Sequence, residues 1–240
     1  MHLAIISTIR SRSVAVSRVF QNTHLFDKTY HEPLTGIYGS HHYPAICKDW
    51  LSEDRFVDVE DVVAMFRHGG RILIKDMAFA SKPCIRFVNT QFLLLFRHPA
   101  DVLRSLAPIV QLDTNDWPDI NVLKDICGYE QLISIHSQLK GLKPMLMCTD
   151  DLTSCRRGFQ HLPVDTPFLE WSKPFEAHDF KKPRYVWQWH RDAIESTSFQ
   201  PGLSTHPIPK HMIEVYQHLT EYFLPHYQYL AEMEKQSVKK

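Results

Sequence analysis

Four short runs of consecutive hydrophobic residues, each bounded by polar or turn-forming residues, are the most regular pattern in the sequence. They occupy residues 2–7, 71–77, 91–96 and 144–149. Uninterrupted rather than alternating hydrophobicity is typical of strands that are buried on both faces, and such strands occur mainly in parallel sheets. The pattern therefore predicts a central parallel sheet of four or five strands.

Segments with the spacing of amphipathic helices lie between these runs. Residues 59–66 place their hydrophobic side chains on one helical face, and Gly69 and Gly70 are expected to end that helix. A second helix is expected from about Ser13, and another after Pro99, since proline fits the first turn of a helix. The alternation of strands and helices predicts an α/β fold with three layers, α/β/α.

The C-terminal stretch from Ile208 to about Lys235 also has amphipathic spacing, and Pro225 is expected to kink or break its helix. We expect this helix to pack on the flank of the sheet. The sequence contains no internal repeat and no linker-like tract, so residues 1–240 are predicted to form a single domain.

The amino-acid composition limits the kinds of partner that the protein is expected to bind. The 27 Lys and Arg residues balance the 27 Asp and Glu residues, so the overall charge gives no reason to expect binding to nucleic acid. The five cysteines include no C-x-x-C pair, and the fifteen histidines are scattered, which favours a reducing compartment and no metal. No hydrophobic run reaches the length of a membrane span, so we expect a cytoplasmic protein.

The first predicted strand leads into residues 7–20, where small hydroxyl residues and arginines precede a helix. The N-terminus of a helix offers unpaired N–H groups and a partial positive charge, so it attracts anions. Arg10 and Ser13 are placed to add hydrogen bonds to a phosphate. The alternative interpretation is a basic, capped helix start without a ligand.

The third strand run ends at another arginine, Arg97, and Ser105 lies on the helix that follows. Open α/β sheets bind ligands at the carboxyl ends of their strands, so Arg97 is placed to meet a phosphate. The alternative is an arginine that forms a salt bridge at a strand end.

Taken together, these two segments resemble the nucleotide-binding motifs of the sulfotransferase family. Residues 97–101, with Ser105 eight positions beyond Arg97, are similar to the motif that binds the 3′-phosphate: arginine, Asp or His, proline, then an acidic residue two positions on. Residues 7–14 are similar to the loop that binds the 5′-phosphosulfate. The resemblance implies a P-loop-like three-layer domain.

In that loop Arg10, Ser11 and Ser13 stand in matching places, whereas Arg12 replaces the usual glycine and Val14 a hydroxyl residue. Ile9 likewise replaces a proline. The resemblance therefore assigns residues 10–14 to the nucleotide, with a changed cradle shape and one hydrogen bond fewer.

Further landmarks appear in family order and are most similar to the branch shared by bacteria and plants. They occupy residues 31–34, 72–79, 150–152, 163–171 and 187–201. The resemblance implies that 3′-phosphoadenosine-5′-phosphosulfate is the donor, that adenosine 3′,5′-bisphosphate is the product, and that no metal is needed. The acceptor cannot be read from the sequence.

The resemblance also assigns roles in sulfuryl transfer. Arg10 and Lys75 are expected to stabilise the transferring group and the leaving oxygen. Small-molecule sulfotransferases have a histidine base two positions beyond that lysine, and this chain has Met77 there. Glu32 is the preferred replacement, with His31 and Asp76 as alternatives.

The last landmark carries aromatic and polar residues that are expected to line the acceptor pocket, to close over the nucleotide, or to pack in the core. They are Trp187, Trp189, Arg191, Ser196 and Phe199.

Two other functions are open. A P-loop kinase or nucleotide hydrolase has a similar sheet and first loop, but this loop has no lysine–hydroxyl pair to hold phosphates and magnesium. A nucleotide-binding relative without catalytic activity agrees with the altered loop and the missing histidine.

Overall fold

A computed structural model describes residues 2–21, 25–42, 56, 58–114, 119–160 and 204–238. Its strands are β1 (His2–Ser7), β2 (Lys28–His31), β3 (Ile72–Met77), β4 (Thr90–Phe96) and β5 (Met145–Cys148). Its α-helices are α1 (Ser13–Gln21), α2 (Pro33–His42), α4 (Val59–Met65), α5 (Pro99–Thr114), α6 (Ile120–Cys127), α7 (Tyr129–Gln138), α8 (Leu152–Gln160) and α10 (Ile213–Val238). Short 3₁₀ turns are η1 (Ala78–Ala80), η2 (Lys82–Arg86), η3 (Lys140–Leu142) and η4 (Lys210–Met212).

The five strands form one sheet, in the order β2-β3-β1-β4-β5, and every pairing is parallel. The prediction of a parallel sheet of four or five strands is confirmed. The four hydrophobic runs correspond to β1, β3, β4 and β5. The remaining strand, β2, lies at an edge, and its side chains are exposed or only partly buried, so it lacks a hydrophobic run.

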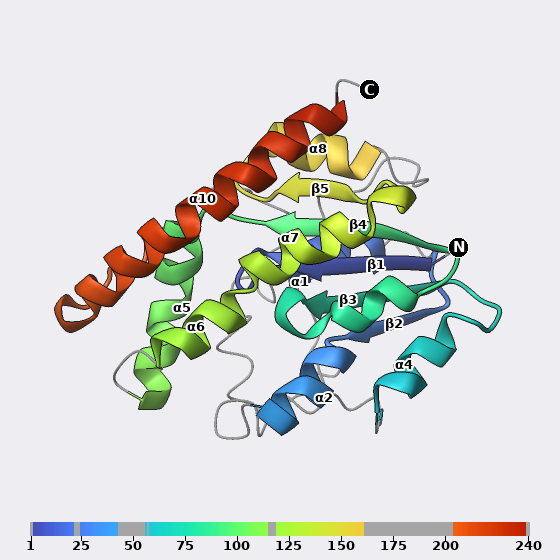
Figure 1. Ribbon diagram of the computed structural model, residues 1–240, viewed down its shortest axis with the longest axis horizontal. Coiled ribbons are helices and arrows are strands. Elements are labelled where there is room, and N and C mark those ends of the chain that lie inside the picture. Colours follow the sequence, from blue (N-terminus) through green and yellow to red (C-terminus); the bar gives the residue numbers. More distant parts are fainter. Residues whose placement is uncertain are drawn as a thin grey trace.

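Helices cover both faces of the sheet, which agrees with the predicted three layers (Figure 1). One face packs against α1 and α8 in a hydrophobic cluster that includes Ile5, Val16 and Phe159. The other face packs against α4, α5, α6, α7 and α10 in a larger cluster. In Figure 1, α7 crosses in front of the strands on this second face. Because helices cover the faces of the sheet, the ends of its strands are where a sheet of this kind can bind ligands.

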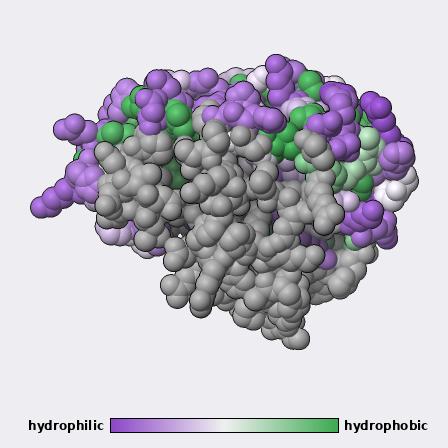
Figure 2. Space-filling model, turned by 90° about the horizontal axis from the view of Figure 1, so that it is seen from below, coloured by the Kyte–Doolittle hydropathy of each residue, from purple (hydrophilic) through white to green (hydrophobic). Residues whose placement is uncertain are grey.

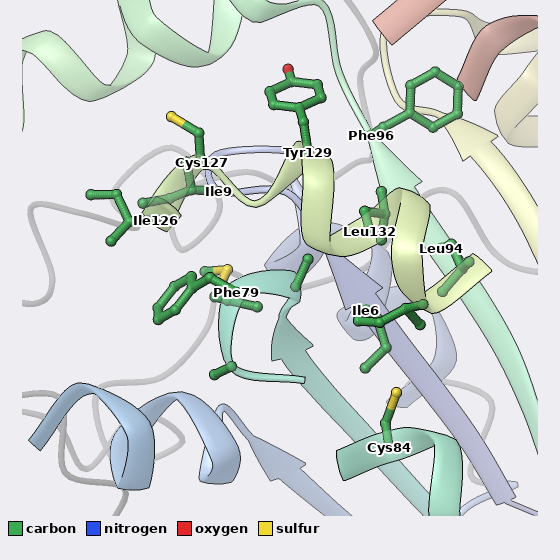
Figure 3. Packing of buried hydrophobic residues seen from close by; sticks show 14 of the residues in the cluster. Ile6, Ile9, Phe79, Cys84, Leu94, Phe96, Ile126, Cys127, Tyr129 and Leu132 are labelled. Carbon is green, nitrogen blue, oxygen red and sulfur yellow. The ribbon is translucent and has the colours of Figure 1, made fainter. Parts of the chain in front are cut away.

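The larger cluster brings the turn after β3 against the α6–α7 junction (Figure 3). Gly128 joins these helices with a φ of +76°, a left-handed conformation that glycine adopts without cost. A β-carbon at this position would lie 3.1 Å from the β-carbon of Ala78. The glycine therefore permits both the sharp turn and the close approach that holds Tyr129 over the end of β4.

Two helix ends differ from the prediction. Helix α4 ends at Met65 rather than at Gly69-Gly70, because its last turn tightens: Phe66 and Arg67 donate to carbonyl groups three positions back. Helix α10 continues through Pro225, so of the expected kink or break the break is wrong, and the kink stays a prediction. Its packing against α5, α7 and β5 outweighs the hydrogen bond that proline removes.

Seen from below, the surface formed by the described residues is mostly hydrophilic. Its hydrophobic residues form small separate groups (Figure 2). Among the described helices, none is long and apolar enough to cross a membrane.

Candidate functional site at the carboxyl edge of the sheet

The loop between β1 and α1 follows the central strand and is fastened to its neighbours. Thr8 N–H donates to Leu95 O at 3.0 Å, and Ser11 Oγ donates back to Thr8 O at 2.7 Å. Arg10 and Arg12 both have left-handed backbones, with φ of 55° and 57°. This conformation favours glycine. Arg12 therefore has a backbone conformation that glycine adopts more readily than other residues; the expectation that the arginine alters the shape of the loop stays a prediction.

Arg10 reaches from this loop to α5, where its Nε donates to Ser105 Oγ at 2.9 Å. Both residues are partly exposed. The two residues lie 95 positions apart in the chain, on the segments that the sequence assigned to two phosphates of one nucleotide. The structure thus brings these segments to the same end of the sheet.

Asp150, just after β5, connects the loop to the end of β4. Its carboxylate accepts from Arg97 Nε at 2.8 Å, from His98 N–H at 2.7 Å and from Arg12 Nη1 at 3.4 Å. Arg12 also donates to Thr149 O at 2.8 Å. Burial is the main cause that lowers the pKa of Arg12, and the positive charge of the nearby Arg97 lowers this pKa further. We call Arg10, Arg12, Arg97, Ser105 and Asp150 the arginine cluster.

Arg97 is only 4% exposed, and besides Asp150 it donates to Arg10 O at 3.4 Å. The sequence left open whether Arg97 binds a phosphate or forms a salt bridge at a strand end. The salt bridge is present, so any ligand contact must be made alongside it.

The first turn of α1 lies directly beyond the loop. Ser13 and Val14 are buried in this turn, at 4% and 6% exposure, and Ser11 is completely buried. Within the described part of the chain, the buried Thr8 Oγ1 has no hydrogen-bond partner. The helix N-terminus and this hydroxyl group give the loop the donors that an anion requires.

A second group of charges lies on the other side of β1, where β2 and β3 end. Lys75 is completely buried and forms an ion pair with Glu32, which is 7% exposed. The backbone joins them too, since Glu32 N–H donates to Lys75 O at 2.6 Å. Glu32 has a left-handed backbone with φ of 57°. The preferred base and the catalytic lysine of the sequence analysis are therefore direct partners.

Asp76 is fully buried beside this pair. Its carboxylate accepts from Leu34 N–H at 2.7 Å, from Thr35 N–H at 2.9 Å, from the Thr35 hydroxyl group, and from Met77 N–H at 2.9 Å. Burial raises the pKa of Asp76 to about 6, although these donors oppose the shift. We call Glu32, Thr35, Lys75 and Asp76 the lysine cluster.

The two clusters are linked through the end of β1. Ser7 Oγ donates to Asp76 O at 3.4 Å, and the loop of the arginine cluster begins at the next residue. His31, the remaining candidate base, lies instead against Gln21 at the end of α1, with 2.9 Å between their side-chain nitrogens. The structure thus brings Glu32, Lys75 and Asp76 together and leaves His31 on the edge strand.

Sequence reasoning missed the roles of Asp150 and Thr35. Asp150 follows a buried strand, and an acidic residue at the end of one parallel strand is a natural partner for an arginine at the end of its neighbour. The position of Asp150 after a buried strand was visible in the sequence. Its pairing with Arg97 could be inferred only once β4 and β5 were known to be neighbours. Trp187, Trp189, Arg191, Ser196 and Phe199 lie outside the described residues.

Within the described part of the chain, no three His, Cys, Asp or Glu side chains are grouped so that they can hold a metal ion. Comparison of the sequence with protein-family models gives no match, and comparison with curated proteins gives none either.

Proposed function

We propose that the protein is a sulfotransferase, which moves the sulfuryl group of 3′-phosphoadenosine-5′-phosphosulfate to a hydroxyl or amine acceptor on a P-loop-like domain. The observation that carries the proposal is the hydrogen bond between Arg10 and Ser105. It joins the two segments in which the sequence resembles the family's phosphate-binding motifs. Adjacent parallel strands already bring the two segments to one edge of the sheet, and the support for the proposal is that the two matching side chains are in direct contact there.

The arginine cluster supports binding of the nucleotide. Loop residues 10–14 and the N-terminus of α1 would hold the 5′-phosphosulfate, and Ser105 with Arg97 the 3′-phosphate. The cluster gathers three guanidinium groups at one end of the sheet, and two of them, those of Arg12 and Arg97, share the Asp150 carboxylate. Guanidinium groups bind phosphates through paired hydrogen bonds, which suits a doubly phosphorylated ligand.

The lysine cluster supports the transfer step. In the proposed reaction the acceptor atom bonds to sulfur, the bond from sulfur to the 5′-phosphate oxygen breaks, and Glu32 takes the acceptor's proton. Lys75 and Arg10 stabilise the charge on the leaving phosphate. Because Lys75 and Glu32 are bonded to each other, Lys75 has to exchange the carboxylate for the phosphate during the reaction.

The complete burial of Lys75 favours a second candidate, a nucleotide-binding relative without transfer activity. A lysine that stays enclosed with Glu32 stabilises the fold and cannot reach a leaving group. A P-loop kinase or hydrolase is less favoured, because the loop supplies no lysine followed by a hydroxyl residue.

Two measurements test these functions. Adenosine 3′,5′-bisphosphate should raise the unfolding temperature, and ATP with magnesium should not, because only the former has a 3′-phosphate. Transfer of ³⁵S from the labelled donor to a panel of acceptors then separates the enzyme from the inactive relative. A larger stabilisation by ATP with magnesium would reject both in favour of the kinase or hydrolase.

A further inference from the structure

We infer that Asp76 is a positioning residue of this site: it caps helix α2 from the neighbouring strand and thereby leaves the Glu32 carboxylate available to Lys75. The catalytic consequence of this role rests on the proposed function. The geometry itself does not depend on it.

Glu32 occupies the position that normally caps α2. The helix begins at Pro33, and Glu32 O accepts the first helical hydrogen bond, from Gly36 N–H at 2.9 Å. A residue in this position usually turns its own side chain onto the N–H groups two and three positions further on. Those groups belong to Leu34 and Thr35, and both donate to Asp76 instead. Pro33 has no N–H group to satisfy.

Because the Asp76 carboxylate accepts from these N–H groups, the Glu32 side chain is not needed as the cap of α2. Its side chain turns to Lys75, while its backbone stays in the left-handed conformation that most residues avoid. Two constraints hold this arrangement: the hydrogen bond from Glu32 N–H to Lys75 O, and the start of α2, which Asp76 fixes. The direction of the Glu32 carboxylate therefore depends on Asp76, although the two carboxylates perform different tasks.

This arrangement also argues against Asp76 as the base. Its carboxylate is fully buried and already accepts from four donors, three on Oδ1 and one, Leu34 N–H, on Oδ2. Taking a proton from an acceptor would disrupt the cap that positions Glu32. Asp76 acts through Glu32 and does not touch the reacting atoms.

The test measures how well Lys75 is protected in the native protein, by timed reaction with a lysine-modifying reagent and mass spectrometry. Asp76→Asn replaces an accepting oxygen with an NH₂ group, which cannot accept from the N–H groups at the start of α2. The start of α2 should therefore loosen, and Lys75 should react about tenfold faster. Glu32→Gln should produce a similar increase. The double variant should react no faster than Glu32→Gln alone, because Asp76 acts through Glu32.

Asp58→Ala is the matched control. Asp58 caps α4 by accepting from Asp61 N–H at 3.0 Å, on a helix that contains no residue of the lysine cluster. Because alanine cannot accept this hydrogen bond, the variant loses a helix cap, and Lys75 should keep its wild-type rate. An equal increase in Asp58→Ala would mean that loss of any cap exposes Lys75, and it would overturn the inference.

Thr35→Val keeps the test decisive if Asp76→Asn does not fold. The variant removes one donor to Asp76 with little change in shape, and it should raise Lys75 reactivity severalfold, whereas Thr35→Ser should restore protection. Unchanged reactivity in Thr35→Val and in any folded Asp76→Asn protein overturns the inference.

Single-turnover sulfuryl transfer separates this inference from the proposed function. Asp76→Asn should slow transfer at least tenfold while adenosine 3′,5′-bisphosphate binds as in the wild type. If the wild-type protein transfers no sulfuryl group but Lys75 protection depends on Asp76 as described, the proposed function fails and the positioning role stands. If transfer occurs and Asp76→Asn retains the full rate, the positioning role is overturned.

Discussion

The arginine cluster and the lysine cluster lie at the same end of one sheet but differ in their charged groups and in their exposure. The first contains three arginines, two of which share the Asp150 carboxylate, and its Arg10 and Ser105 are partly exposed. The second encloses one ammonium group with two carboxylates, almost entirely away from water. The difference teaches that β1 separates a partly exposed, arginine-rich strand end from a buried, carboxylate-rich one; in the proposed function the first would bind the anion and the second would take the proton.

The largest effect is expected at Glu32. Glu32→Gln keeps the shape of the side chain but cannot take a proton, so single-turnover sulfuryl transfer should fall about 10²- to 10⁴-fold. Affinity for adenosine 3′,5′-bisphosphate, measured by calorimetry, should hardly change because the proposed function assigns that ligand to the arginine cluster.

Glu60→Gln is the control for the removal of a carboxylate, since Glu60 pairs with Arg86 on the exposed surface. Full activity of Glu32→Gln, with loss in His31→Asn, would move the base to the edge strand.

The second effect concerns stability. Lys75→Met leaves Glu32 almost buried and without its ammonium partner, which should lower the free energy of unfolding by about 3–5 kcal/mol. Arg86→Met breaks an exposed pair and should barely shift the denaturation midpoint. Denaturation curves of both variants measure the contrast. Equal shifts would show that the lysine cluster is hydrated and that the proposed division is wrong.

The third effect is a pH dependence. Complete burial raises the pKa of Asp76 from 3.8 to about 6, so the folded protein binds this proton more tightly than the unfolded chain does. The Asp76 contribution to the free energy of unfolding should therefore decrease as pH rises from about 4 to 6, by on the order of 3 kcal/mol.

Asp76→Asn lacks this titration, so the stability difference between wild type and variant should change over that pH interval and level off above it. Glu32 and Lys75 face the same space, and Glu32 adds to the rise in the Asp76 pKa. A difference that is constant with pH would contradict the raised pKa.

The smallest effect is expected at the partly exposed Ser105. Ser105→Ala removes a hydroxyl group that is assigned to the 3′-phosphate, so adenosine 3′,5′-bisphosphate should bind about tenfold more weakly while AMP is unaffected. Ser134→Ala, at an exposed position of α7, is the control. Equal losses for both nucleotides in calorimetry would remove Ser105 from the 3′-phosphate site.

Sequence patterns predicted the parts of the fold that burial dictates. The strands β1, β3, β4 and β5 are buried on both faces, so they appear as hydrophobic runs, and Pro99 marks the start of α5 correctly. Strand β2 has one neighbour and a polar sequence, so no local pattern identifies it. Helix α4 ends in a tightened turn before the two glycines, and the continuity of α10 depends on tertiary packing; local rules for glycine and proline predict neither.

The sequence predicted which residues belong to the candidate site but not which of these residues contact one another. Arg10, Arg97 and Ser105 were placed together because parallel strands end at one edge. The partners that neutralise them, above all Asp150, required the order of the strands. Likewise Asp76 was considered as a base from its position in the sequence, and only the start of α2 over β3 reveals its four donors.

Arg12 has a mechanical consequence. Its backbone serves as a glycine would, but its side chain extends from the loop after the central strand to Thr149, beyond the edge strand β5. The carboxylate that it meets there also holds Arg97 at the end of β4. The loop, the end of β4 and the segment after β5 are therefore joined through one carboxylate, so we expect a displacement of one of them to be accompanied by displacement of the other two.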